Sequence, residues 1–215
     1  MMHFERYTCV RFVQRTNEKN YVRIFKGPGC FSKVGRNKGE QVLSLAKGCW
    51  NHGTIVHELN HVVGFYHEQN RPDRDEYLKV FWENIEQDME AQFVKFTPHE
   101  MRLLNEFDYN SVMLYGERFF SKDGHSRTLE ALKPGVSLID VSSKPGLSKM
   151  EKKHEVPSGL VFRLLPAFPL KRRLATPKSR PVPLSPSSLA VRWRPASHNS
   201  AILQFSPSSE RRLEN

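Results

Sequence analysis

The most informative stretch of the sequence is His57-Glu58-Leu59-Asn60-His61-Val62-Val63-Gly64-Phe65-Tyr66-His67. On a helix, residues four apart project from the same face, so His57 and His61 can bind one zinc ion. Gly64 lacks a Cβ and can adopt the left-handed conformation that ends a helix and turns the chain back. His67 can then supply a third ligand. Three histidines leave coordination positions for water and substrate, which is typical of a catalytic zinc site.

Glu58 suits the role of general base beside such a metal. It follows His57 on the helix, so its carboxylate is offset from the ligand face but remains close to the ion. Zinc lowers the pKa of a water that it binds from about 16 to about 7, so a carboxylate can take the proton and later transfer it to a departing amine. The alternative is an ordinary buried helix that happens to contain histidines. The third histidine and the glycine favour the metal site, and a structural or redox role is disfavoured because the cluster contains no cysteine.

The first 150 residues show the short apolar runs of a domain that mixes helices and strands. Residues 21–25 and 41–45 are predicted strands, separated by glycine-rich turns. Farther along, Ile85, Met89 and Phe93 recur every fourth position and predict an amphipathic helix over residues 83–96.

A second helix is predicted to begin at Thr97-Pro98-His99-Glu100. This run offers an N-cap residue, a proline at the first helical position and a glutamate at the third.

The positive charge of the chain is concentrated in its last third. The total is +10, and from Glu151 onward twelve Lys and Arg stand against four Asp and Glu, a net of +8. The nearly balanced residues 1–150 give no reason to expect a nucleic-acid partner. The tail, residues 151–215, also holds nine of the fourteen prolines, and residues 157–215 are predicted to be disordered. The alternative to a solvated, disordered tail is that its basic runs bind polyanions.

No stretch of the sequence has the roughly 18 to 20 continuous apolar residues that a membrane-spanning helix needs. The first residues also lack the apolar core of a signal peptide. The three cysteines, Cys9, Cys30 and Cys49, form an odd number, which leaves one thiol unpaired in a protein with disulfides.

Two further motifs point to a known family. The histidine motif with its glycine resembles the metzincin signature, and its continuation, His67-Glu68-Gln69-Asn70-Arg71-Pro72-Asp73-Arg74-Asp75, resembles the astacin family of zinc metalloendopeptidases. The run Ser111-Val112-Met113-Leu114-Tyr115 resembles the Met-turn of that family, with Leu114 in a position that is usually His. The resemblance implies that Met113 forms an apolar floor under the histidines. It also implies that Tyr115 is an additional zinc ligand that moves away and donates its hydroxyl to the developing oxyanion.

The resemblance also implies a fold and a location. The expected fold is α+β and astacin-like, with an upper lobe of twisted sheet and helices, an irregular lower lobe, and zinc in the cleft between them. In the family the cysteines equivalent to Cys30 and Cys49 are bonded, which implies a secreted protein. Residues 41–45 would resemble the sheet edge that pairs with an extended peptide substrate.

The two ends of the chain depart from the family pattern. Residues 1–150 are predicted to be a catalytic domain that lacks its start and its last helix. Ser148 and Glu151 open a helix that Pro157 should stop, and Cys9 has lost its family partner.

The sequence thus predicts a zinc-dependent endopeptidase that hydrolyses internal bonds of protein or peptide substrates. The predicted metal ligands are His57, His61 and His67, with Glu58 as base and Tyr115 as oxyanion stabiliser. The alternative is a catalytically inactive truncated fragment that at most binds proteins or polyanions.

Overall fold

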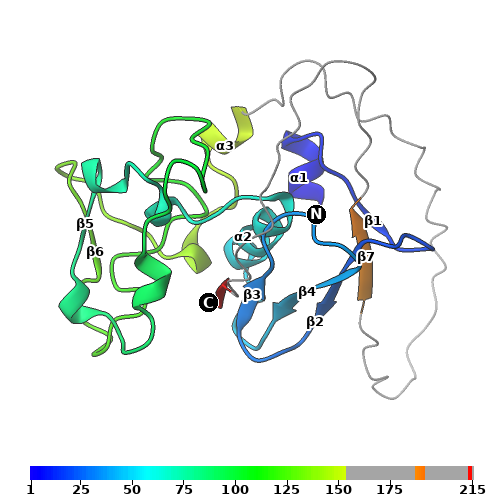
Figure 1. The fold of residues 1–215 in the computed structure, drawn as a ribbon, viewed down its shortest axis with the longest axis horizontal. Coiled ribbons are helices and arrows are strands. Elements are labelled where there is room, and N and C mark those ends of the chain that lie inside the picture. Colours follow the sequence, from blue (N-terminus) through cyan, green and yellow to red (C-terminus); the bar gives the residue numbers. More distant parts are fainter. Residues whose placement is uncertain (154–186, 192–212, 215) are drawn as a thin grey trace, which may run out of the picture.

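The computed structural model describes residues 1–153, 187–191 and 213–214 (Figure 1). Its helices are α1 (Met2–Tyr7), α2 (His52–Val63) and α3 (Lys149–Lys153), with short 3-10 helices η1 (Glu68–Asn70), η2 (Arg74–Glu76), η3 (Trp82–Asn84), η4 (Glu90–Phe93) and η5 (Val141–Ser143). Its strands are β1 (Phe12–Gln14), β2 (Tyr21–Phe25), β3 (Cys30–Ser32), β4 (Glu40–Leu45), β5 (Leu78–Val80), β6 (Leu129–Ala131), β7 (Ser187–Val191) and β8 (Leu213–Glu214).

The main sheet has the strand order β1-β7-β2-β4-β3-β8 (Figure 1). Strands β2 and β4 are parallel, and β3 is antiparallel to β4. The strands predicted at residues 21–25 and 41–45 are therefore confirmed. The prediction that residues 41–45 form the sheet edge is wrong, because β4 pairs with β2 on one side and with β3 on the other. Strand β3 follows β4 in the order of the sheet, and β8 pairs with β3 through Phe31 and Ser32.

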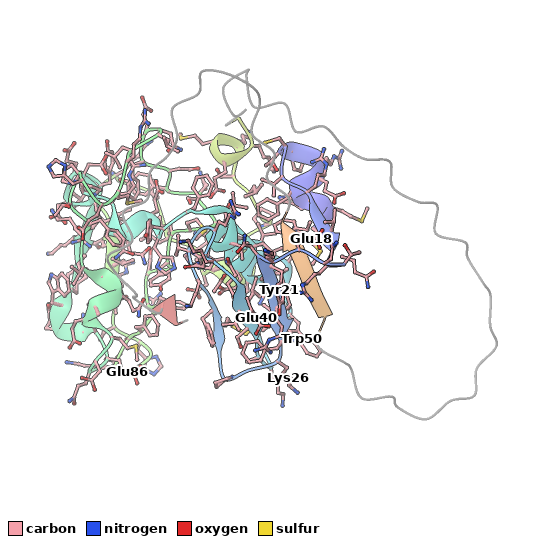
Figure 2. All side chains as sticks on the ribbon, turned by 45° about the vertical axis from the view of Figure 1, so that its right-hand side comes forward. Glu18, Tyr21, Lys26, Glu40, Trp50 and Glu86 are labelled. Carbon is pink, nitrogen blue, oxygen red and sulfur yellow. A yellow bond between two sulfur atoms is a disulfide. The ribbon has the colours of Figure 1, made fainter. Side chains whose placement is uncertain are left out.

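A polar cluster on the exposed face fixes the register of the parallel pair β2 and β4. The register places Tyr21 opposite Glu40. The Tyr21 hydroxyl donates to Glu40 Oε2 over 2.5 Å, and Arg23 Nε lies 2.7 Å from Glu40 Oε1. Figure 2 shows Tyr21 and Glu40 on these neighbouring strands. Because exposed ion pairs contribute little net stability, this cluster selects the register more than it stabilises the sheet.

Strand β7 is the main difference from the predicted disorder of residues 157–215. It lies between β1 and β2 and is antiparallel to both, with Leu189 opposite Gln14 on one side and Val22 on the other. Two neighbouring strands that do not pair with each other leave unsatisfied backbone groups, and an inserted strand satisfies both rows. The prediction is corrected for residues 187–191 and 213–214, and its remainder lies outside the described residues.

The core has two parts. The first packs α1 and α2 against the sheet and includes Phe4, Leu43, Val56, Leu59, Val62 and Met113. The second lies among the 3-10 helices and the β5–β6 pair and includes Leu78, Phe93, Phe107, Leu114 and Leu129. An ordered sheet part and a largely irregular part agree with the predicted α+β architecture. Among the described residues, no helix combines the length and the apolar character needed to cross a bilayer.

The helix predicted over residues 83–96 does not form. Only η3 and η4 occur there, separated by Asp88 in a left-handed conformation with φ of 71°. The carbonyls of Gln92 and Val94 accept hydrogen bonds from the side chain of Asn70, and that of Phe93 accepts from Arg74. Tertiary hydrogen bonds thus replace the helical ones, although Phe93 still enters the core as its spacing indicated.

The helix predicted to begin at Thr97 is also absent. Glu100 accepts hydrogen bonds from the backbone N–H and the hydroxyl of Thr97, as in a capping box, but the chain forms only a turn. The following Leu103 and Leu104 are exposed. A capped first turn does not propagate without an apolar face to bury.

The capping box predicted at Ser148 does open a helix, α3. The N–H of Glu151 donates to Ser148 Oγ over 3.0 Å, and the N–H of Ser148 donates to Glu151 Oε2 over 2.6 Å. The predicted stop at Pro157 lies outside the described residues.

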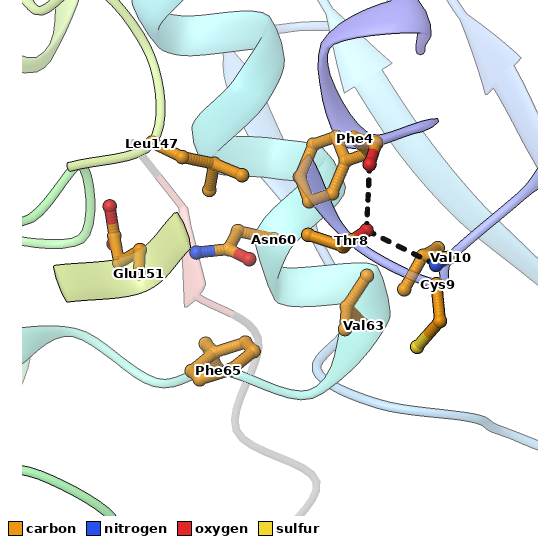
Figure 3. A pocket seen from close by; sticks show the side chains of 9 residues that line it. All are labelled: Phe4, Thr8, Cys9, Val10, Asn60, Val63, Phe65, Leu147 and Glu151. Atoms are coloured by element: carbon orange, nitrogen blue, oxygen red, sulfur yellow. Dashed lines mark hydrogen bonds between the residues drawn. The ribbon is translucent and has the colours of Figure 1, made fainter. Parts of the chain in front are cut away.

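The cysteines behave as the family resemblance implied. Cys30 and Cys49 form a disulfide, and Cys9 is a free thiol. Cys9 borders a small, mainly apolar pocket of about 80 Å³, which Phe4, Asn60, Leu147 and others line (Figure 3). The pocket lies between α1, α2 and α3 and contains none of the predicted site residues.

Replacing Leu189 with proline tests whether β7 is part of the sheet. Proline removes a backbone donor and leaves a partner unsatisfied, so we expect the free energy of unfolding to fall by about 1–3 kcal/mol. Leu189→Val keeps the N–H and favours a strand, and it should change stability much less. Urea unfolding of the full chain measures both. Equal stability of the two variants would show that β7 does not pair with β1 and β2 in the folded protein.

Candidate metal centre

Helix α2 carries three of the predicted site residues on one rigid element. It begins after Asn51, whose side chain accepts a hydrogen bond from the N–H of Thr54 over 2.8 Å. Its apolar residues Val56, Leu59 and Val62 face the core and fix its rotation. His57, Glu58 and His61 are consequently buried, each at most 1% exposed.

The end of α2 turns the chain so that His67 returns to the helix. Gly64 has φ of 125°, and its N–H donates to the carbonyls of Asn60 and His61. A side chain is disfavoured at such a φ, which confirms the role predicted for this glycine. The N–H of Glu68 then donates to the carbonyl of Met113 over 2.9 Å and holds the returning chain.

The three histidines converge through their Nε2 atoms. Nε2 of His67 lies 3.1 Å from Nε2 of His57 and 3.0 Å from Nε2 of His61. Nδ1 of His57 lies 2.8 Å from the carbonyl oxygen of Val112, and Nδ1 of His61 lies 2.7 Å from that of Phe65. Because a carbonyl only accepts, both Nδ1 atoms carry the hydrogen, and both Nε2 atoms carry lone pairs.

This donor set fits a zinc ion. The N–H of one imidazole can satisfy only one of two facing lone pairs, whereas a cation satisfies all three nitrogens together. Zinc–nitrogen bonds of about 2.0–2.1 Å in tetrahedral geometry place ligand nitrogens about 3.3 Å apart, close to the observed separations. The three rings form a possible metal group within the described residues.

Burial keeps the three imidazoles neutral. It lowers the pKa of His61 to about 4 and lowers the pKa values of His57 and His67 well below the usual value, with a further contribution from His61 in both cases. A neutral imidazole is the form that binds metal, so the site is prepared for a cation at neutral pH.

Tyr115 lies beside the histidines, as the resemblance implied. Its ring centroid is 4.5 Å from that of His67, and the side chain is fully buried. Burial, and secondarily the carboxylate of Glu58, raise the pKa of Tyr115 well above its usual value. The hydroxyl therefore remains protonated at neutral pH and can act as a hydrogen-bond donor.

The structure brings the three histidines together with Tyr115 against His67, and buries Glu58 next to His57 on α2. It also adds partners that sequence reasoning missed. The carbonyls of Val112 and Phe65 orient two of the ligands, but backbone atoms leave no residue-type signal in a sequence. Met113 is buried in the core cluster that includes Val56 and Leu59 of α2. Hydrogen bonds from a metal-binding histidine to a backbone carbonyl, as at Val112 and Phe65, commonly set the tautomer and the direction of the ring.

Comparison with known proteins identifies the family and the fold of the chain. The family model of the astacin peptidases matches residues 1–153. The chain belongs to the astacin family. Among solved structures, high choriolytic enzyme 1, a hatching enzyme zinc-protease of the medaka fish Oryzias latipes, superposes with a TM-score of 0.65 at 38% identity, covering 71% of this chain and 74% of that one. The fold is therefore that of an astacin-like metzincin.

Several curated astacin relatives are similar in sequence. Astacin-like metalloprotease toxin 1 of Loxosceles intermedia is 46% identical over 151 residues, which are 69% of this chain and 57% of the toxin. Zinc metalloproteinase nas-6 of Caenorhabditis elegans is 43% identical over 137 residues, 63% of this chain and 40% of that protein. The chain spans 57% of the length of toxin 1 and 61% of the length of astacin-like metalloprotease toxin 2, also of Loxosceles intermedia.

The histidine pKa values predict how acid competes with metal. Zinc binds the neutral ring, so affinity is lost as the pH falls through the pKa of the ligands. Because burial lowers the pKa of His61 to about 4, we expect zinc to stay bound through pH 6.5 and to leave only as the pH approaches 4. Metal analysis after dialysis at stepped pH values measures this. Release centred on pH 6.5 would mean that the rings are solvated.

Proposed function

We propose that this chain is a zinc-dependent endopeptidase that hydrolyses internal peptide bonds of protein substrates. The convergence of three imidazole Nε2 atoms in a buried site that also holds Glu58 carries this proposal. His57, His61 and His67 would hold the ion. When bound, zinc would lower the pKa of a water to about 7 and polarise the carbonyl of the scissile bond.

Glu58 is the proposed general base and acid. It follows His57 on α2, and its complete burial removes competing bulk water from the carboxylate. From there it would take a proton from the attacking water and transfer it to the nitrogen of the departing amine. Such proton transfer contributes about 10²–10⁴-fold to a rate.

Tyr115 is the proposed stabiliser of the oxyanion. Its raised pKa keeps the hydroxyl proton in place, and its ring packs against His67 beside the proposed metal position. A neutral donor held in a dry site stabilises negative charge that develops on the substrate oxygen.

The proposed catalytic domain comprises residues 1–150, followed by the basic tail of residues 151–215. Helix α3 continues to Lys153, and the Glu151 carboxylate accepts a hydrogen bond from Ser111. Strand β7 pairs with β1 and β2, so two segments of residues 151–215 pack with the domain. The disulfide between Cys30 and Cys49 supports a secreted protein, because such bonds persist in oxidising compartments.

The proposed partners are protein or peptide chains rather than nucleic acids. An extended substrate would pair with β3, the antiparallel strand on the outer side of β4. Strand β8, Leu213–Glu214, takes that pairing position in the structure.

Replacing Glu58 with glutamine tests the proposed base. We expect cleavage of a denatured protein substrate to fall by about 10²–10⁴-fold while zinc content stays at one ion per chain. Glu83→Gln, which removes an exposed carboxylate, is the matched control and should keep full activity. If folded, zinc-loaded wild-type protein cleaves nothing, the chain is the inactive binding fragment instead.

Replacing Tyr115 with phenylalanine separates stabilisation of the transition state from substrate binding. The change removes only the hydroxyl, so we expect kcat to fall about 10²–10³-fold with little change in KM. Steady-state kinetics on a fluorogenic peptide measures both constants. A change confined to KM would assign the hydroxyl to substrate binding.

A further inference from the structure

A single turn, residues 111–115, connects several parts of the proposed metal site. The carbonyl of Val112 orients His57, and the carbonyl of Met113 accepts from the N–H of Glu68, next to His67. Tyr115 lies at the end of the same turn. The direction of one ligand, the placement of another and the position of the proposed oxyanion donor therefore all depend on the conformation of these five residues.

Two further carbonyls of this turn accept hydrogen bonds from the same buried lysine side chain. Nζ of Lys144 donates to the carbonyl of Ser111 over 2.6 Å and to that of Leu114 over 2.5 Å. These are charge-assisted hydrogen bonds, which are shorter and stronger than neutral ones. The first and fourth residues of the turn are thus joined by one ammonium group, and the lysine that carries it is only 5% exposed.

The backbone of Lys144 is itself held against α2. It follows η5, and its N–H donates to the carbonyl of Val141 over 3.1 Å. A Cβ on Gly53 would lie 1.9 Å from the carbonyl oxygen of Val141 and 2.8 Å from that of Lys144. Only glycine allows this approach, so the first turn of α2 packs directly on the segment that carries the ammonium.

Acidic groups around Lys144 favour the charged form of its side chain. Burial lowers the pKa of Lys144 to about 8, and Glu151, Asp108, Asp140 and Glu68 oppose that lowering. Glu151 also accepts a hydrogen bond from the hydroxyl of Ser111 over 2.9 Å, so the turn is held by an anion and a cation together. An ammonium this deeply buried is costly unless its hydrogen bonds are made.

We propose that Lys144 is a positioning residue for the metal site. By joining the carbonyls of Ser111 and Leu114 it holds the turn in the one conformation in which Val112 directs Nε2 of His57 toward the other two rings. The inference rests on the proposed function, because it concerns the same three ligands. Lys144 touches neither metal nor substrate and acts through the turn and His57.

The test compares Lys144→Met, Lys144→Arg and Lys149→Met in the full chain. Methionine keeps the aliphatic length but removes the donors, so we expect the Kd for zinc to rise about 10–100-fold. Arginine keeps charge and several donors and should restore most of the affinity. Lys149 is exposed on α3, and its methionine variant is the matched control. Competition with a chromophoric chelator measures the Kd, and visible absorption of the cobalt-substituted protein reports ligand geometry.

The expected result is a weakened zinc affinity and an altered cobalt spectrum for Lys144→Met alone. Wild-type affinity and spectrum in a folded Lys144→Met protein would overturn the proposal, as would an equal loss in Lys149→Met. Should Lys144→Met fail to fold, the side-chain ammonium resonance of Lys144 in wild-type protein serves instead. It should shift on zinc binding far more than that of Lys149, and equal shifts would overturn the proposal. Wild-type protein that binds no zinc would refute the proposed function rather than the role of Lys144.

Discussion

The structure depends on bringing three imidazole nitrogens within 4.8 Å of one another inside a protein core. Neutral rings with their acceptor atoms together repel unless a cation joins them, so the surrounding chain must hold them in place. It does so with backbone carbonyls: Val112 fixes His57, and Phe65 fixes His61. One carbonyl lies just beyond the end of α2, and the other lies far along the chain. The site therefore requires both a correct helix end and a correct tertiary turn.

The turn of residues 111–115 meets that requirement through buried charge. Lys144 and Glu151 would each be costly alone, but they share Ser111, since one donates to its carbonyl and the other accepts from its hydroxyl. A buried polar network in which each member is bonded permits few alternative arrangements, so it specifies a conformation more than it adds stability. Such specification suits a site where a small displacement of His57 would separate the three nitrogens.

Sequence reasoning succeeded where geometry is local. The spacing of His57 and His61 sets their common face, Gly64 ends the helix by its own conformational freedom, and the capping box at Ser148 opens α3. It failed where tertiary contacts compete with local preference. Over residues 83–96 the apolar period did identify Phe93 as core, but side chains of η1 and η2 capture the carbonyls that a helix would need. The apolar period of a segment predicts which side chains are buried more reliably than it predicts the conformation of the backbone.

The same distinction explains why the ligands could be named from the sequence and Lys144 could not. A metal ligand must be one of a few residue types at a spacing that the helix fixes, so the pattern is visible without a fold. A residue that holds a turn thirty positions away needs only a donor of the right length, and many lysines in the sequence satisfy that condition. What distinguishes Lys144 is the glycine at position 53, which lets α2 approach its backbone closely. Neither Gly53 nor Lys144 indicates this role from the sequence alone, because the role depends on their packing against each other in the folded chain.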